Sequence, residues 1–206
     1  MKSCWSCAHP LSLRALSCDA CHVLQPPNPG RSHFEVLEVP AAFSLAPEVL
    51  EASFKRLSRL LHPDRYAGAS DRERRFSLEH ATALNDAYRT LRVPMKRAEY
   101  LLGLWGRKIS EEGGRKALPL EFLEEVLELQ EALMEARLEG DTTTLHTKLE
   151  HARGLWRQHY EAVVRLFDEG ATLAPESREA VLNALEPEVM TLRYLHNLLS
   201  ELGAAA

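Results

Sequence analysis

The chain has 206 residues, 45% of them hydrophobic, and a formal net charge of −5. This length can hold one medium domain or two small ones with hydrophobic cores, and the acidic balance argues against a general nucleic-acid binder. The sequence contains neither a run of about 20 apolar residues, as a membrane span needs, nor an apolar signal-peptide core, so we expect a globular cytoplasmic protein without a membrane partner.

All cysteines of the chain lie near its N-terminus, in two CxxC motifs formed by Cys4, Cys7, Cys18 and Cys21. Two such motifs can supply four thiolates to one tetrahedral zinc ion. We therefore expect one structural zinc per chain, in a knuckle over residues 1–25 that could not form a core without metal. Disulfides are the alternative, but they need an oxidising compartment, and no βαβ pattern supports a thioredoxin-like redox site.

Residues 26–31 contain three prolines and a glycine and are predicted to be a linker that tethers the knuckle semi-independently. A helical hairpin is predicted next. Its first helix has apolar residues at helical spacing up to Leu61, and Pro63 must end it because proline removes a donor and restricts the preceding residue. A second helical pattern resumes beyond a polar loop. The tripeptide His62-Pro63-Asp64 therefore lies at the exposed tip of the hairpin.

The remainder of the chain begins with a short helix over about residues 96–105, followed by a second predicted linker, residues 106–118, rich in glycine and charge. Three long amphipathic helices follow. Their short loops imply an antiparallel three-helix bundle over residues 119–206. The expected helices are Pro119–Leu138, Asp141–Phe167 with Asp141 as its N-cap, and Pro175–Leu202, which Pro187 should kink or interrupt.

Charge is segregated along the chain. Between Lys55 and Arg75 seven basic residues oppose three acidic ones, a net of +4, whereas between Pro119 and Glu139 seven glutamates oppose one arginine, a net of −6. Either run alone is typical of a solvated helix surface. Together they predict two faces of opposite sign.

The short helix at Phe34-Glu35-Val36-Leu37, the basic helix, the His-Pro-Asp loop and the antiparallel helix resemble the J-domain of DnaJ-type co-chaperones, over residues 32–105. A J-domain followed by an acidic three-helix bundle resembles the HscB family of iron–sulfur co-chaperones. The tetracysteine knuckle resembles that of eukaryotic and some bacterial members. The expected fold is all-α: a J-domain hairpin and a C-terminal bundle, preceded by a small zinc knuckle.

The resemblance implies a protein that is not an enzyme but delivers an IscU-like scaffold protein to a DnaK/HscA-type chaperone and stimulates its ATPase. It also implies two binding surfaces. The chaperone-binding residues would be His62, Pro63, Asp64, Lys55, Arg56, Arg59 and Arg65. The client-binding residues would be Leu123, Leu127, Glu128, Glu131, Glu135 and Tyr194. Glu124 departs from the methionine of some members. We expect a monomer or weak dimer, in the cytoplasm or, if a transit peptide has been removed, in the mitochondrial matrix.

The residues themselves support the client surface in part. Phe122, Val126, Leu129 and Leu133 already form an inward stripe at core spacing. Leu123 and Leu127 lie about a quarter-turn or more away, so we expect them to be exposed beside the glutamates. The alternative is that both leucines belong to the core.

The sequence leaves three alternative functions open. A metal-dependent hydrolase would use His62, Asp64 and His80, although no carboxylate–histidine set recurs at ligand spacing. A zinc-ribbon nucleic-acid binder would contact phosphates through Arg72, Arg74 and Arg75. The third is a J-domain protein with a different client.

Overall fold

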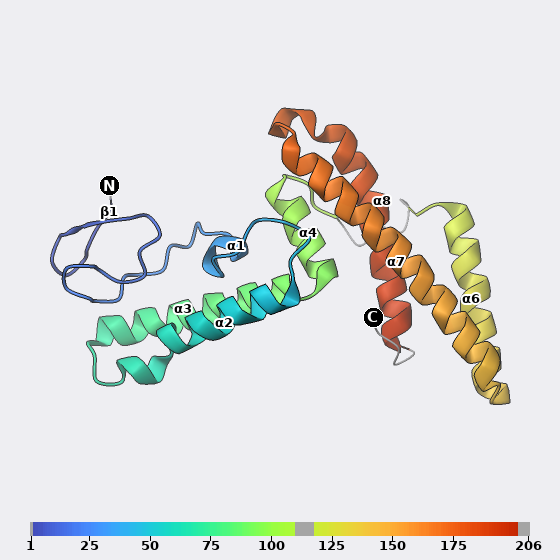
Figure 1. Ribbon diagram of the computed structural model, residues 1–206, viewed down its shortest axis with the longest axis horizontal. Coiled ribbons are helices and arrows are strands. Elements are labelled where there is room, and N and C mark those ends of the chain that lie inside the picture. The colour runs from blue at the N-terminus through green and yellow to red at the C-terminus, as the bar shows by residue number, and fades with distance from the viewer. Residues whose placement is uncertain (1, 110–117, 202–206) are drawn as a thin grey trace. The chain divides into compact units, whose positions relative to one another are not determined.

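The computed structural model describes residues 2–109 and 118–201, in two compact units (Figure 1). The first unit comprises Met1–Ala41 and Leu45–Val93, and the second comprises Ala42–Ser44 and Pro94–Ala206. Helices dominate both units, which confirms the predicted all-α fold class. Within the described ranges, no helix has both the length and the apolar character that crossing a bilayer requires.

The first unit begins with the small knuckle. Strand β1 (Lys2–Ser3) pairs antiparallel with β2 (Pro10–Leu11), and an isolated bridge joins Ser17 to Leu24. The core cluster of this knuckle consists of the buried Cys4, Leu11 and Cys18. So small a core cannot hold a fold by hydrophobic burial alone.

The helical hairpin of the first unit follows. Helix α1 (His33–Val36) starts at a capping box between Ser32 and Glu35. Helix α2 (Pro47–Leu61) is followed by His62, whose backbone is extended at φ −61° and ψ 130° because Pro63 comes next. The short helix η1 (Pro63–Tyr66) forms the tip, and α3 (Asp71–Leu91) returns alongside α2 (Figure 1).

The second unit contains α4 (Pro94–Leu104), α6 (Leu120–Glu139), α7 (Thr142–Thr172), η2 (Pro175–Ser177) and α8 (Glu179–Glu201). Helix α7 packs against both α6 and α8, and α4 packs against α8 (Figure 1). The side chain of Asp141 accepts the N–H groups of Thr143 and Thr144, both at 3.0 Å, and so caps α7 as predicted. The predicted three-helix bundle is therefore present, with α4 added to it.

The predicted end of the middle helix was wrong, and Pro187 does not interrupt the last helix. Helix α7 continues five residues beyond Phe167, through Gly170. Gly170 is a site of close packing, because a Cβ there would lie 2.7 Å from the Trp105 ring. Helix α8 is not interrupted at Pro187; the fully buried Leu185 and Val189 on either side hold it in the core, which outweighs the loss of one hydrogen bond.

The grouping of the chain differs from the predicted linkers. The two units divide at residues 93 and 94, so α4 groups with the bundle. Arg107, predicted to lie in a linker, forms ion pairs with Glu179 at 2.8 Å and Glu186 at 3.1 Å on α8. Most of the rest of that predicted linker, residues 110–117, lies outside the described residues, as does the predicted end of the last helix at Leu202.

Candidate metal centre and docking surfaces

The two CxxC motifs form the same backbone turn. In each, the residue after the second cysteine has a positive φ, 60° at Ala8 and 59° at His22. The N–H of Ala8 donates to the carbonyl of Cys4 at 3.0 Å, and that of His22 donates to the carbonyl of Cys18 at 2.8 Å. A left-handed L-residue costs roughly 1–2 kcal/mol, so each turn carries strain that a bound ion would offset.

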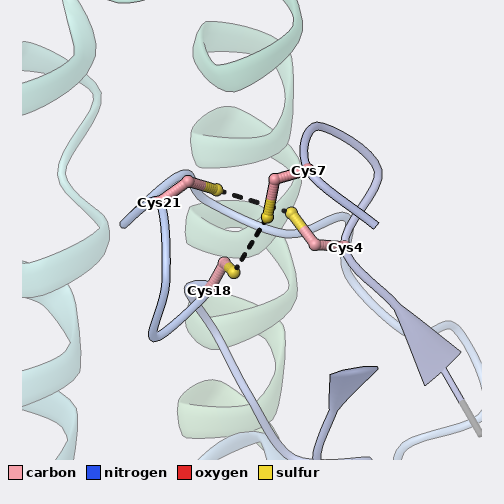
Figure 2. Close-up of side chains that lie close together, drawn as sticks. All are labelled: Cys4, Cys7, Cys18 and Cys21. Carbon is pink, nitrogen blue, oxygen red and sulfur yellow. Dashed lines mark hydrogen bonds between the residues drawn. The ribbon is translucent and has the colours of Figure 1, made fainter. Parts of the chain in front are cut away.

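The turns bring all four sulfurs together. The sulfurs lie within 4.8 Å of one another, with 3.6 Å between Cys4 and Cys21 and 3.6 Å between Cys7 and Cys18 (Figure 2). Zinc–sulfur bonds of about 2.3 Å in a tetrahedron place sulfurs roughly 3.8 Å apart. All four cysteines are free rather than joined in disulfides. The residues therefore fit a tetrahedral metal ion, and within the described ranges this is the only such cluster.

The thiols of the cluster influence one another's ionisation. Burial raises the pKa of Cys4, but the backbone N–H groups of Cys7 and Ser6 outweigh it and bring the pKa to about 6. The backbone at His9 lowers the pKa of Cys7, but neighbouring sulfurs and burial raise it to about 12. One thiolate therefore forms readily and opposes the next. A cation at the centre would allow all four to ionise.

Gln25 supports the cluster from behind. Its side chain is almost fully buried, and its Nε2 donates to the Cys4 sulfur at 3.3 Å and to the Val23 carbonyl at 2.9 Å. Its Oε1 accepts the N–H of Trp5 at 3.4 Å. No sequence pattern indicated this role, because an isolated glutamine beside prolines is typical of a solvated linker.

The knuckle packs against α3, although the proline-rich segment predicted a semi-independent module. The Trp5 ring meets Phe76 edge-on with 6.1 Å between centroids, and the Arg72 guanidinium lies 5.0 Å from the Trp5 ring centroid. His80 Nε2 lies 2.9 Å from the carbonyl oxygen of Gln25. These contacts use side chains that the linker composition does not reveal.

The His-Pro-Asp tip is exposed and locally ordered. His62 Nδ1 accepts the backbone N–H of Asp64 at 3.3 Å and lies 3.5 Å from the Asp64 carboxylate. The side chains of His62 and Asp64 are 56% and 90% exposed. With Nδ1 accepting, the neutral ring carries its proton on Nε2, where an acceptor of a partner can bind. The tip thus presents a donor and a carboxylate in one orientation.

The predicted basic face is also exposed, but its charges are not equivalent. Lys55 pairs with Glu51 at 2.5 Å, and Arg56 pairs with Glu38 at 2.5 Å. Arg59 and Arg65 are exposed and form no ion pair with any described residue. These two arginines are therefore the least neutralised charges of this face.

The residues weighed for other functions are engaged elsewhere. His80 is bonded to Gln25, and burial lowers its pKa while that hydrogen bond opposes the shift. It forms no metal cluster with His62 or Asp64 among the described residues. Arg72 covers Trp5, Arg74 bonds to Asp71 and Arg75 pairs with Glu79. Neither the hydrolase nor the phosphate-binding interpretation gains support.

On α6 the predicted client residues differ in burial. Phe122, Val126, Leu129 and Leu133 are buried as predicted. Leu127 is 56% exposed, but Leu123 is only partly exposed because it packs against the bundle core, as does Tyr194 of α8. Tyr194 meets the Phe122 ring edge-on at 6.1 Å. The glutamates of the predicted surface are exposed: Glu128, Glu131 and Glu135.

The structure adds exposed apolar residues to this surface that the sequence interpretation missed. Leu120, Met134 and Leu138 are 70%, 67% and 83% exposed. With Leu127 they follow one side of α6 at spacings of seven and four residues. Those spacings are visible in the sequence, and could have been found by asking which apolar positions remain once the core stripe is assigned.

Two family comparisons match these parts. Residues 32–100 match the DnaJ domain. Residues 118–203 match the HSCB C-terminal oligomerisation domain. The first match contains the hairpin and its tip, and the second contains α6, α7 and α8.

Relatives that match across both parts of the chain agree with these matches. The chain is 35% identical over 173 residues to a co-chaperone protein HscB homolog of Burkholderia multivorans, covering 84% of this chain and 93% of that protein. It is 37% identical over 140 residues to the iron-sulfur cluster co-chaperone protein HscB of Mus musculus, covering 66% of this chain but only 59% of the mouse protein. The crystal structure of human co-chaperone protein HscB is similar with a TM-score of 0.83 and 26% identity, over 98% of this chain and 97% of that one.

Proposed function

Because the chain belongs to the HscB family of co-chaperones, we propose that it delivers an IscU-like iron–sulfur scaffold protein to a DnaK-type chaperone such as HscA and stimulates that partner's ATPase. The name of the mouse relative points to iron–sulfur clusters. The hydrolysis would belong to the chaperone. This chain would change the rate only by binding the chaperone state poised for hydrolysis better than its other states.

The observation that carries this proposal is the ordered, exposed tip. Pro63 fixes the turn, and the Asp64 N–H to His62 Nδ1 bond sets the orientation of the imidazole. Arg59 and Arg65 would add long-range attraction to an acidic partner surface. A rigid polar tip with a basic flank suits recognition of one conformation of a partner.

We propose that α6 binds the client, the IscU-like scaffold protein. Its exposed Leu127 stands beside Glu128, Glu131 and Glu135, so the matching client surface would have a small apolar site with basic surroundings. Leu123 and Tyr194 would contribute from the edge of the core. The further apolar positions of α6 are compatible with weak self-association of a chain that is otherwise monomeric.

The four cysteines would hold zinc. The ion would supply the positive charge that four thiolates need and would close the small knuckle core. A four-thiolate zinc site needs reduced cysteines, which persist in reducing compartments, so we place the protein in the cytoplasm or the mitochondrial matrix.

The test is single-turnover ATP hydrolysis by a DnaK-type chaperone with this chain as cofactor. We expect His62→Gln to reduce stimulation at least tenfold, because glutamine cannot reproduce the imidazole contacts of the tip, while helicity and scaffold binding stay unchanged. His146→Gln, an exposed histidine on α7, is the matched control and should stimulate normally. Full stimulation by His62→Gln would contradict the assignment of the tip.

A further inference from the structure

One face of α3 holds the knuckle. Arg72, Phe76 and His80 lie four residues apart and so share one side of the helix. Each has a separate partner in the knuckle: the first two contact Trp5, and the third contacts Gln25. A carbonyl oxygen can only accept, so His80 must carry its proton on Nε2 and donate it to Gln25.

The same turn of α3 also holds the end of α2. Ser77 is fully buried, and its Oγ donates to the carbonyl of Leu61 at 2.7 Å. Leu61 is the last residue of α2 and directly precedes His62. Carbonyls at a helix end have no partner in the helix. Ser77 therefore stabilises the backbone from which the His-Pro-Asp tip begins.

The knuckle side of this contact depends on the cysteine cluster. Trp5 directly follows Cys4, and its indole Nε1 donates to the Leu24 carbonyl at 2.8 Å. Gln25 reaches the Cys4 sulfur with its side chain and His80 with its carbonyl. The knuckle core cluster consists of Cys4, Cys18 and Leu11, so without a bound ion little holds the two turns in place. Both anchors of α3 would then lose their fixed position.

We propose that metal bound by the knuckle stabilises the His62-Pro63-Asp64 tip through the Trp5–Phe76 and Gln25–His80 contacts and the Ser77–Leu61 bond. Metal loss would then loosen the tip although no metal ligand lies in it. The linkage itself depends only on contacts within the first unit. Its consequence, a chaperone interaction that responds to metal, rests on the proposed function.

The proposal can be tested with substitutions in α3, because metal binding and the contact between the knuckle and α3 must affect each other equally. If metal stabilises the contact with α3, then weakening the contact must lower the affinity for metal by the same factor. Zinc affinity is measured on the full chain by competition with a chromophoric chelator. We expect His80→Leu to weaken zinc binding about 3- to 10-fold, the range for one hydrogen bond. His80→Gln should restore it, because the glutamine Nε2 can donate from a similar position.

A matched control is Leu78→Gln, which changes an exposed side chain on the same helix and should leave zinc affinity unchanged. Rescue by His80→Gln separates the hydrogen bond from a merely steric role of the imidazole. Equal zinc affinity in His80→Leu and the unaltered chain would overturn the proposal.

Hydrogen exchange tests the same link without a substitution. Removing zinc from the full chain should speed amide exchange in residues 72–84 and 57–66, whereas α6 and α7 should keep their protection. Faster exchange confined to the knuckle would overturn the proposal. Neither measurement contains a chaperone, so their outcome is independent of whether His62→Gln abolishes ATPase stimulation.

Discussion

The tip of the hairpin and the outer side of α6 are both proposed to bind partners, but they are built differently. At the tip, a proline and a few hydrogen bonds fix the orientation of two exposed polar side chains. On α6, apolar side chains simply project from a regular helix whose opposite side forms the bundle core. The exposed side chains of the tip are therefore positioned by backbone geometry, and those of α6 by the helical spacing of its apolar residues.

This difference decides whether a substitution on each surface lowers binding alone or binding and stability together. His62 and Asp64 take no part in a hydrophobic core, so their loss should affect binding alone. Leu123 of α6 contacts both the proposed client side and the bundle core, so its loss should affect binding and stability together. The two surfaces also carry opposite charge, +4 and −6. Each therefore attracts a partner that the other repels.

The largest effect should come from removing one of the four thiolates of the metal centre in the first unit. We expect Cys18→Ser to remove about one equivalent of zinc per chain, because Cys18 is fully buried within the cluster and three thiolates leave a tetrahedral site incomplete. Structural zinc contributes on the order of 10 kcal/mol to the folding of small knuckles, so the knuckle should unfold. Metal analysis and circular dichroism measure both effects.

Ser17→Ala is the control for this prediction, since Ser17 is exposed beside Cys18 and should not affect metal content. The bundle of the second unit should keep its helicity in both variants, because its core consists of hydrophobic side chains and contains no cysteine. Unchanged zinc content in Cys18→Ser would contradict a four-thiolate site.

The features that could be predicted from the sequence act through local geometry. Pro63 ends α2 because it holds His62 in an extended conformation. The spacing within each CxxC motif fixes how two thiols can share an ion. Asp141 capped α7 for the same reason, since its side chain needs only the next two or three N–H groups. The periodic core stripe of α6 was also predicted, because α6 buries one face.

The features that were missed depend on tertiary contacts. Gly170 lies beyond the predicted end of the middle helix, but it is part of α7 and leaves space for the Trp105 ring. Helix α8 continues through Pro187 because its neighbours are buried in the core. Gln25 and His80 meet across 55 positions of sequence, so no local pattern connects them. Leu123 lies at the boundary between core and surface, where periodicity alone cannot assign a side.

The second prediction separates the two leucines of α6. We expect Leu127→Ser to lower scaffold affinity about tenfold or more with little change in melting temperature, because Leu127 is 56% exposed. Leu123→Ser should lower affinity and also the free energy of unfolding, by roughly 1 kcal/mol or more, because it loses packing against the core. Calorimetric titration and thermal unfolding measure the pair.

Leu78→Ser on α3, where the leucine is 60% exposed, is the matched control and should change neither quantity. If Leu127→Ser binds the scaffold normally while Leu123→Ser does not, the client surface lies at the edge of the core rather than on the outer side of α6. A melting temperature that falls as far in Leu127→Ser as in Leu123→Ser would contradict the assigned exposure.

The smallest effect should come from single charges beside the tip, and it distinguishes paired from unpaired arginines. Arg59 forms no ion pair with any described residue, whereas Arg56 pairs with Glu38. We expect Arg59→Ala to slow association with the chaperone a few-fold at low salt, and Arg56→Ala to slow it less. The difference should shrink as salt rises, because the Debye length falls from about 30 Å at 0.01 M to about 8 Å at 0.15 M. Stopped-flow association rates measure this dependence. A defect of Arg59→Ala that is equal at both salt concentrations would instead indicate a direct short-range contact, and would place Arg59 with the orientation-specific residues of the tip.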